Sequence, residues 1–80
     1  MTVGTAPNRI PVHHARTGCL VGHFDATRGR AHETGPDRLA IATRNQALVT
    51  ALIQPAPNGG TRLAVLRAGD LWGAPGFEPA

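Results

Sequence analysis

The side chains best suited to chemistry lie close together in the first part of the sequence. Twenty residues contain the set His13, His14, Cys19, His23 and His32, and imidazole and thiolate groups are the usual ligands of structural zinc. Their spacing argues against a metal site, because Cys19 and His23 on an extended strand would lie about 13 Å apart at about 3.3 Å per residue. Zinc ligands usually come in close pairs instead. We therefore expect ordinary strand and loop histidines, with no metal and no other cofactor.

Cys19 is the only cysteine and the best candidate for a nucleophile, because the chain has no Ser, Lys or Tyr. A Cys/His/Asp arrangement would need an imidazole such as His23, with Asp25 or Asp37 behind it. Two apolar residues follow Cys19, which favours a buried, unreactive thiol. A chain of 80 residues also leaves little room for a cleft that buries a substrate. The sequence thus predicts that the protein is not an enzyme and has no catalytic residues.

All eight positive charges are Arg, and the formal net charge is +3. The tripeptide Arg28-Gly29-Arg30 resembles the centre of AT-hook minor-groove binders, and this resemblance implies contact with nucleic acid through the minor groove or the phosphates. Three more arginines would add charge if the fold gathers them on one face: Arg16, Arg38 and Arg44. Two acidic residues nearby, Glu33 and Asp37, favour the alternative that these arginines solubilise the surface or hydrogen-bond a protein partner.

Two aromatic residues near the end of the sequence, Trp72 and Phe77, are further candidates for contact. As the only Trp in a chain short of large apolar residues, Trp72 suits a buried position, although aromatic residues are also frequent in interface hot spots. Phe77 lies among Gly and Pro residues, so it either folds back onto the domain or docks into another chain. The predicted partner-binding residues are Arg28, Arg30, Trp72 and Phe77.

Hydrophobic alternation predicts several short strands. Residues 9–14 and 19–24 form a plausible hairpin, in which Leu20 and Phe24 share one face. Residues 25–37 contain no apolar residue larger than Ala, which predicts a long loop. Alternation resumes in residues 38–42, as expected for a half-buried strand.

Residues 44–54 are compatible with two structures. Thr43 followed by Gln46 fits a capping box, which predicts a helix that ends before Pro55. Alternatively, Arg44 and Asn45 make a tight turn, and a strand at 46–54 pairs across a Gly/Pro-rich loop with residues 61–67. We favour the strand, because β-branched residues flank that loop on both sides.

These elements predict a mainly β protein, either a small antiparallel meander or an SH3-like barrel, or an α+β fold if residues 44–54 form a helix. Residues 1–8 are expected to be a flexible N-terminal arm, residues 9–72 a single small domain, and residues 73–80 a flexible C-terminal tail. The expected core residues are Leu20, Phe24, Leu39, Ile41, Val49, Ile53, Leu63 and Val65.

The composition favours a role in assembly. The hydrophobic fraction is 41%, but 13 of these residues are Ala, so the core is thin for a chain with a single Cys and no possible internal disulfide. We expect a non-catalytic protein-interaction or structural subunit with a protein partner or a second copy of itself; the alternative is a small Arg-based nucleic-acid-binding protein. The sequence has no apolar run long enough to span a membrane and no export signal, so we expect no membrane partner. Arg as the only cationic residue, together with many Ala, Gly and Pro, is typical of proteins from GC-rich genomes. We therefore expect a GC-rich bacterium or one of its phages as the source, and a cytoplasmic or virion location.

Overall fold

The computed structural model describes residues 9–57 and 59–80, which form seven β-strands and one short 3₁₀-helix. The predicted mainly β class is confirmed, and residues 44–54 contribute a turn and a strand rather than a helix. The predicted arm, residues 1–8, lies outside the described residues. The elements are β1 (Arg9–His14), β2 (Leu20–Asp25), β3 (Ala31–Gly35), β4 (Arg38–Ala42), β5 (Leu48–Pro55), β6 (Thr61–Val65), the 3₁₀-helix η1 (Ala68–Leu71) and β7 (Phe77–Pro79).

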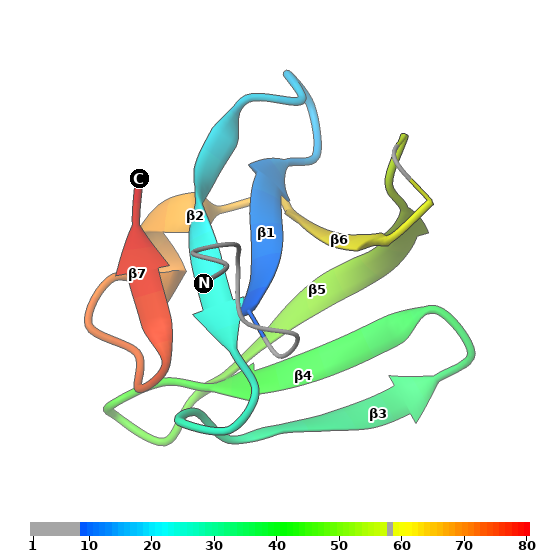
Figure 1. Cartoon of the computed structure of the whole chain (residues 1–80). Coiled ribbons are helices and arrows are strands. Elements are labelled where there is room, and N and C mark those ends of the chain that lie inside the picture. The colour runs from blue at the N-terminus through cyan, green and yellow to red at the C-terminus, as the bar shows by residue number, and fades with distance from the viewer. Residues whose placement is uncertain (1–8, 58) are drawn as a thin grey trace, which may run out of the picture.

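The strands form one sheet in the order β3-β4-β5-β6-β1-β2-β7, and this sheet curls into a half-barrel (Figure 1). Neighbouring strands are antiparallel except β1 and β6, which run parallel. The parallel pair forms because the chain leaves the β1–β2 hairpin, builds the β3–β6 meander and then returns alongside β1. The fold therefore belongs to the expected class of small β meanders and SH3-like barrels, with one parallel pair joining its two halves.

The β4–β5 hairpin confirms the strand alternative for the middle of the chain. Ile41 pairs with Val49 across the two strands, and the connecting turn is closed by the Ala47 carbonyl, which accepts a hydrogen bond from the Thr43 amide at 2.8 Å. The turn is longer than predicted, since β5 begins at Leu48. Gln46 in this turn has a positive φ of 64°. A longer hairpin loop typically ends with such a left-handed residue.

β3 is the main element that the sequence failed to predict, because it occupies five residues of the loop expected at 25–37. Ala31 lies opposite Ile41 and Glu33 opposite Leu39, in antiparallel pairing with β4. β3 is at one edge of the sheet and has no apolar side chain larger than Ala. Its place is therefore fixed by backbone hydrogen bonds to one neighbour, which leave no hydrophobic pattern in the sequence.

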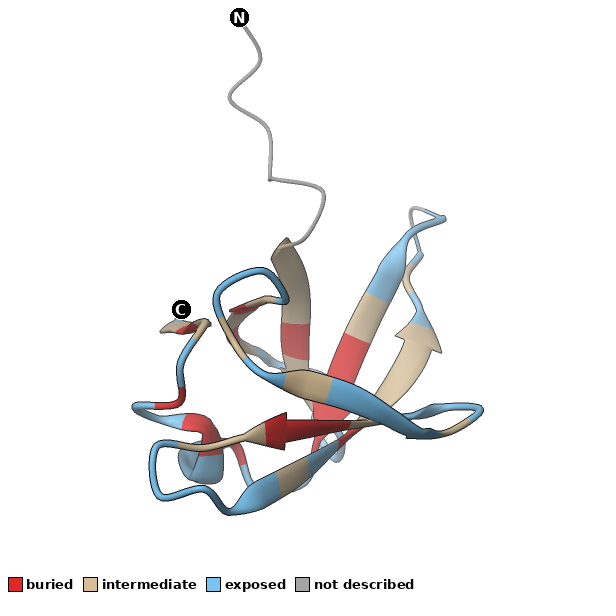
Figure 2. Ribbon diagram, turned by 90° about the horizontal axis from the view of Figure 1, so that it is seen from below, coloured by how far each residue is buried: buried red, intermediate tan, exposed pale blue. Residues whose placement is uncertain are grey.

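The core lies on the inner side of the curled sheet. Buried segments meet where the strands come together, and the hairpin ends are exposed (Figure 2). Four of the predicted core residues are buried: Phe24, Ile41, Leu63 and Val65. Three others are half-buried and pack against the core: Leu39, Val49 and Ile53. The sequence missed Val12 and Leu71, which are both fully buried.

Leu20 is the exception among the predicted core residues, because it is 45% exposed. The β1–β2 pairing shifts between Val12, which lies opposite Gly22, and His13, which lies opposite Leu20. This bulge places one extra residue in β2, and such an insertion reverses the faces of the residues beyond it. Leu20 consequently does not share the buried face of Phe24.

The C-terminal residues 73–80 belong to the domain, in contrast to the flexible tail that the sequence predicted. β7 pairs with β2 at the other edge of the sheet, with Phe77 opposite Phe24, and Phe77 is only 8% exposed. Gly76, at a φ of 84°, makes the tight turn that precedes β7. The Gly and Pro residues that suggested a tail are thus used for turns and for close packing.

Candidate functional site

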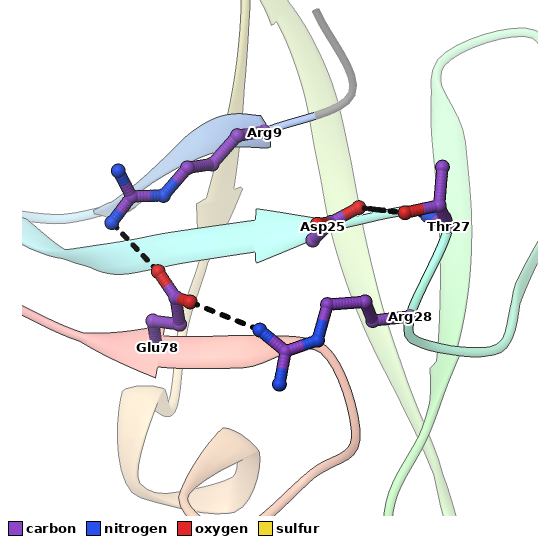
Figure 3. Close-up of polar contacts among 5 residues, drawn as sticks. All are labelled: Arg9, Asp25, Thr27, Arg28 and Glu78. Atoms are coloured by element: carbon purple, nitrogen blue, oxygen red, sulfur yellow. Dashed lines mark hydrogen bonds and ion pairs between the residues drawn. The ribbon is translucent and has the colours of Figure 1, made fainter. Parts of the chain in front are cut away.

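An ion-pair network joins the C-terminal strand to the loop that contains the Arg28-Gly29-Arg30 tripeptide. Glu78 on β7 lies between two arginines (Figure 3), with its Oε1 2.6 Å from Arg9 Nη2 and its Oε2 3.2 Å from Arg28 Nη1. All three side chains are partly exposed, so the network contributes little free energy. The network places the Arg28 guanidinium group beside β7.

The start of the same loop is fixed by Asp25. Its carboxylate accepts hydrogen bonds from the Thr27 hydroxyl at 2.6 Å and from the Thr27 backbone amide at 2.9 Å (Figure 3). These hydrogen bonds lower the pKa of Asp25 below its ordinary value of 3.8. The Asp25 carbonyl also accepts from the Gly29 amide at 3.0 Å, so the loop is a closed turn rather than an extended segment.

Gly29 has a packing role that the sequence did not reveal. A Cβ at this position would lie against the Pro75 carbonyl oxygen and 2.6 Å from Phe24 Cε1, which is far inside van der Waals contact. Glycine is therefore required so that the loop can lie directly on the core and on the segment before β7. The tripeptide is held in a turn by this packing, whereas the AT-hook resemblance had implied a segment that enters a minor groove.

The turn brings Arg28 and Arg30 to a hollow of about 480 Å³ that a third arginine, Arg44, also lines. Among the described residues the remaining lining residues are Ala42, Thr43, Gln46 and Pro75, none of which is acidic. We call it the arginine hollow. The sequence predicted that Arg16, Arg38 and Arg44 would add charge if the fold gathered them on one face. The β4–β5 turn places Arg44 in the arginine hollow, whereas Arg16 and Arg38 do not line it.

Beside the arginine hollow lies a second surface, on which large hydrophobic side chains are exposed among polar ones. Four large hydrophobic side chains among the described residues are exposed, and three of them line two adjoining hollows: Leu48 at 57%, Leu66 at 65% and Trp72 at 63% exposure. Both hollows share Leu48, Val49 and Asp70. We call the surface formed by Leu48, Val49, Leu66 and Trp72 the apolar surface.

The two aromatic candidates have opposite environments. Leu71, the last residue of η1, is fully buried, and Trp72 follows it with an extended backbone that leaves its side chain exposed. Phe77 instead belongs to the core. The predicted contact residues Arg28, Arg30 and Trp72 are therefore on the surface, whereas Phe77 is buried.

Leu48 and Leu66 were not predicted as contact residues. Leu66 directly follows the buried run of β6, and Leu48 begins β5, so in the sequence each reads as part of a hydrophobic strand. Their position could have identified them, since both lie at the end of a strand, where a hydrophobic side chain need not face the core.

The histidines and Cys19 do not form a common site. No group of three His, Cys, Asp or Glu side chains within residues 9–57 and 59–80 could hold a metal ion. Cys19 is exposed rather than buried as expected, and His13 Nδ1 donates to the Gly18 carbonyl at 2.9 Å. Burial and the charge of Arg9 lower the pKa of His23 below its ordinary value, and Glu78 opposes them only in part.

No helix in the described part of the chain is both long and apolar enough to span a membrane. No protein-family model, curated protein or solved structure matches this chain.

Proposed function

We propose that this chain is a non-catalytic binding module that contacts another protein through the apolar surface. The observation that carries the proposal is the grouping of three exposed large side chains, Leu48, Leu66 and Trp72, around two adjoining hollows. Single exposed hydrophobic residues are common on protein surfaces, but a group of them next to hollows is typical of an interaction site.

The energetics support a specific contact. Burying an exposed Leu or a larger side chain contributes about 1.5–3 kcal/mol, so three of them supply several kcal/mol before the cost of association is subtracted. Trp and Arg are also the residues most enriched in interface hot spots. Trp72 and Arg44 line the same hollow, and Arg67 lies at the edge of the other. The partner in this proposal is either a different protein or a second copy of this chain.

Nucleic-acid binding is a second candidate function, and the arginine hollow is the observation that favours it. Three arginines line this hollow, and only Arg28 among them has an acidic partner, Glu78. Such a group is a suitable site for phosphates, and an exposed Trp can stack on a base. Leu48 and Leu66 have no role in this function, which is why we place it second.

Native mass spectrometry of the untagged protein, purified from the cells that produce it, tests the proposal. We expect the chain to be found in a complex or closed oligomer heavier than 8.3 kDa, and Leu66→Asp to release it as a monomer. Leu20→Asp is the matched control, because Leu20 is exposed but lines neither hollow. A wild-type monomer, a complex that survives Leu66→Asp, or a complex that contains only nucleic acid would count against the proposal.

A further inference from the structure

We infer that the partner segment seated on the apolar surface also carries carboxylates, which bind in the arginine hollow: the ligand is an acidic protein segment with an apolar anchor residue. This inference rests on the proposed function and adds the chemistry of the partner. It is argued from the charges of the arginine hollow and from its continuity with the apolar surface.

The arginine hollow is electrostatically incomplete within the described residues. Arg28 is partly neutralised by Glu78, at 3.2 Å. Arg30 and Arg44 are exposed and form no ion pair with any residue in the ranges 9–57 and 59–80. Guanidinium groups bind planar carboxylates through paired hydrogen bonds, so this hollow is complementary to Asp or Glu side chains.

The two surfaces are continuous. Thr43 and Arg44 line both the arginine hollow and the hollow that contains Trp72. The turn that carries them is closed by hydrogen bonds from the Thr43 amide to Ala47 and from the Gln46 amide to Thr43, at 2.8 and 3.0 Å. A single bound segment can therefore contact the apolar surface and the arginine hollow while crossing one ordered turn.

The composition of the combined surface favours a protein segment over a nucleic acid. A phosphate backbone offers no apolar group for Leu48 and Leu66, which are both more than half exposed. Asp70 lines both apolar hollows, so a ligand has to place an uncharged group there, and any carboxylates that it carries are expected at the arginine hollow. A peptide that carries an aliphatic or aromatic residue next to Asp or Glu satisfies both the apolar and the charged parts of the surface.

Selection from a random dodecapeptide display library on the immobilised wild-type protein tests the inference. We expect enriched peptides that place Asp or Glu beside an aliphatic or aromatic residue. The acidic preference should disappear when selection is repeated on Arg30→Gln/Arg44→Gln, and the apolar preference should disappear on Trp72→Ala. The matched control is Arg16→Gln/Arg38→Gln, which removes the same charge from exposed positions outside the hollow and should preserve both preferences.

Binding of the enriched peptides is then measured by fluorescence anisotropy, alongside a labelled single-stranded oligonucleotide of twelve thymidines. Loss of two exposed ion pairs should weaken the peptides by about fivefold in Arg30→Gln/Arg44→Gln, and the effect should shrink as salt is raised. Circular dichroism of each variant confirms that the fold is intact.

Three results would overturn the inference. The first is enrichment of apolar residues without acidic ones, which would leave the proposed function standing. The second is the absence of any enriched peptide. The third is tighter binding of the oligonucleotide than of any peptide, with loss of that binding in Arg30→Gln/Arg44→Gln, which would make the hollow a phosphate site.

Discussion

Replacement of Phe77 by Ala should strongly destabilise the fold, although Phe77 lies in the short edge strand β7. Phe77 is 8% exposed and is part of the core, and its ring lies over Gly22 of β2. Truncation of a buried Phe costs about 3–5 kcal/mol. A domain of 80 residues has a total stability of about 4–12 kcal/mol at about 0.05–0.15 kcal/mol per residue. Phe77→Ala is thus expected to remove a large part of the free energy of unfolding.

Trp72→Ala is the matched comparison, because it removes a larger side chain that is 63% exposed. Only about a third of the Trp72 surface is buried, so at about 25 cal/mol per Å² the loss should be at most about 2 kcal/mol. Urea unfolding followed by far-ultraviolet circular dichroism measures both variants without relying on Trp fluorescence. If Phe77→Ala lowered the free energy of unfolding by less than about 1 kcal/mol, or by less than Trp72→Ala did, the assignment of β7 to the core would be wrong.

Three further outcomes are expected. Gly29→Ala should destabilise the fold by about 1–3 kcal/mol, because the added methyl group overlaps the core. The control Gly35→Ala has open space around it and should change the free energy of unfolding by less than about 0.5 kcal/mol. Equal effects of the two substitutions in thermal unfolding would refute the packing role of Gly29. His23 resists protonation in the folded state, since burial and Arg9 lower its pKa below 6.5, so stability should fall as the pH drops through that value. His23→Gln should remove the part of this fall in stability that comes from His23, between about pH 7.5 and pH 5.5. If the free energy of unfolding of His23→Gln changed with pH as in the wild type, His23 would not be the cause. Glu78→Gln should cost at most about 1 kcal/mol, and this cost should vanish at about 1 M NaCl; a salt-independent cost would show that Glu78 acts by packing.

The sequence predicted the strands that carry apolar side chains to the core. β1, β2, β4, β5 and β6 have this pattern, and the loops that connect their hairpins contain the Gly, Pro and Asn residues that turns require. β3 has no such pattern, because an edge strand with polar faces is held by its backbone alone. β7 was hidden for a different reason: its single large apolar residue, Phe77, is flanked by turn residues, and only the parallel return of β6 brings that part of the chain to β2.

The candidate site was predicted only in part. Arg28 and Arg30 were identified from their tripeptide, but the reason for the glycine between them, close contact with Phe24 and Pro75, depends on tertiary structure. Arg44 joins them only because the β4–β5 turn lies next to the segment before β7. Leu71 and Trp72 are adjacent in the sequence, and which of them is buried is decided by the short helix η1, whose orientation no local pattern specifies.

Site-specific photo-cross-linking at Trp72 tests the proposed protein interface most directly. A photoreactive benzoylphenylalanine replaces Trp72 in the cells that produce the protein, and a second variant carries it at Leu20, which is exposed outside the apolar surface. We expect position 72 to form an adduct with one protein, either a different chain or a second copy of this one, and position 20 to form none. Equal adducts from both positions, an adduct with nucleic acid alone, or no adduct at position 72 would contradict a protein interface centred on Trp72.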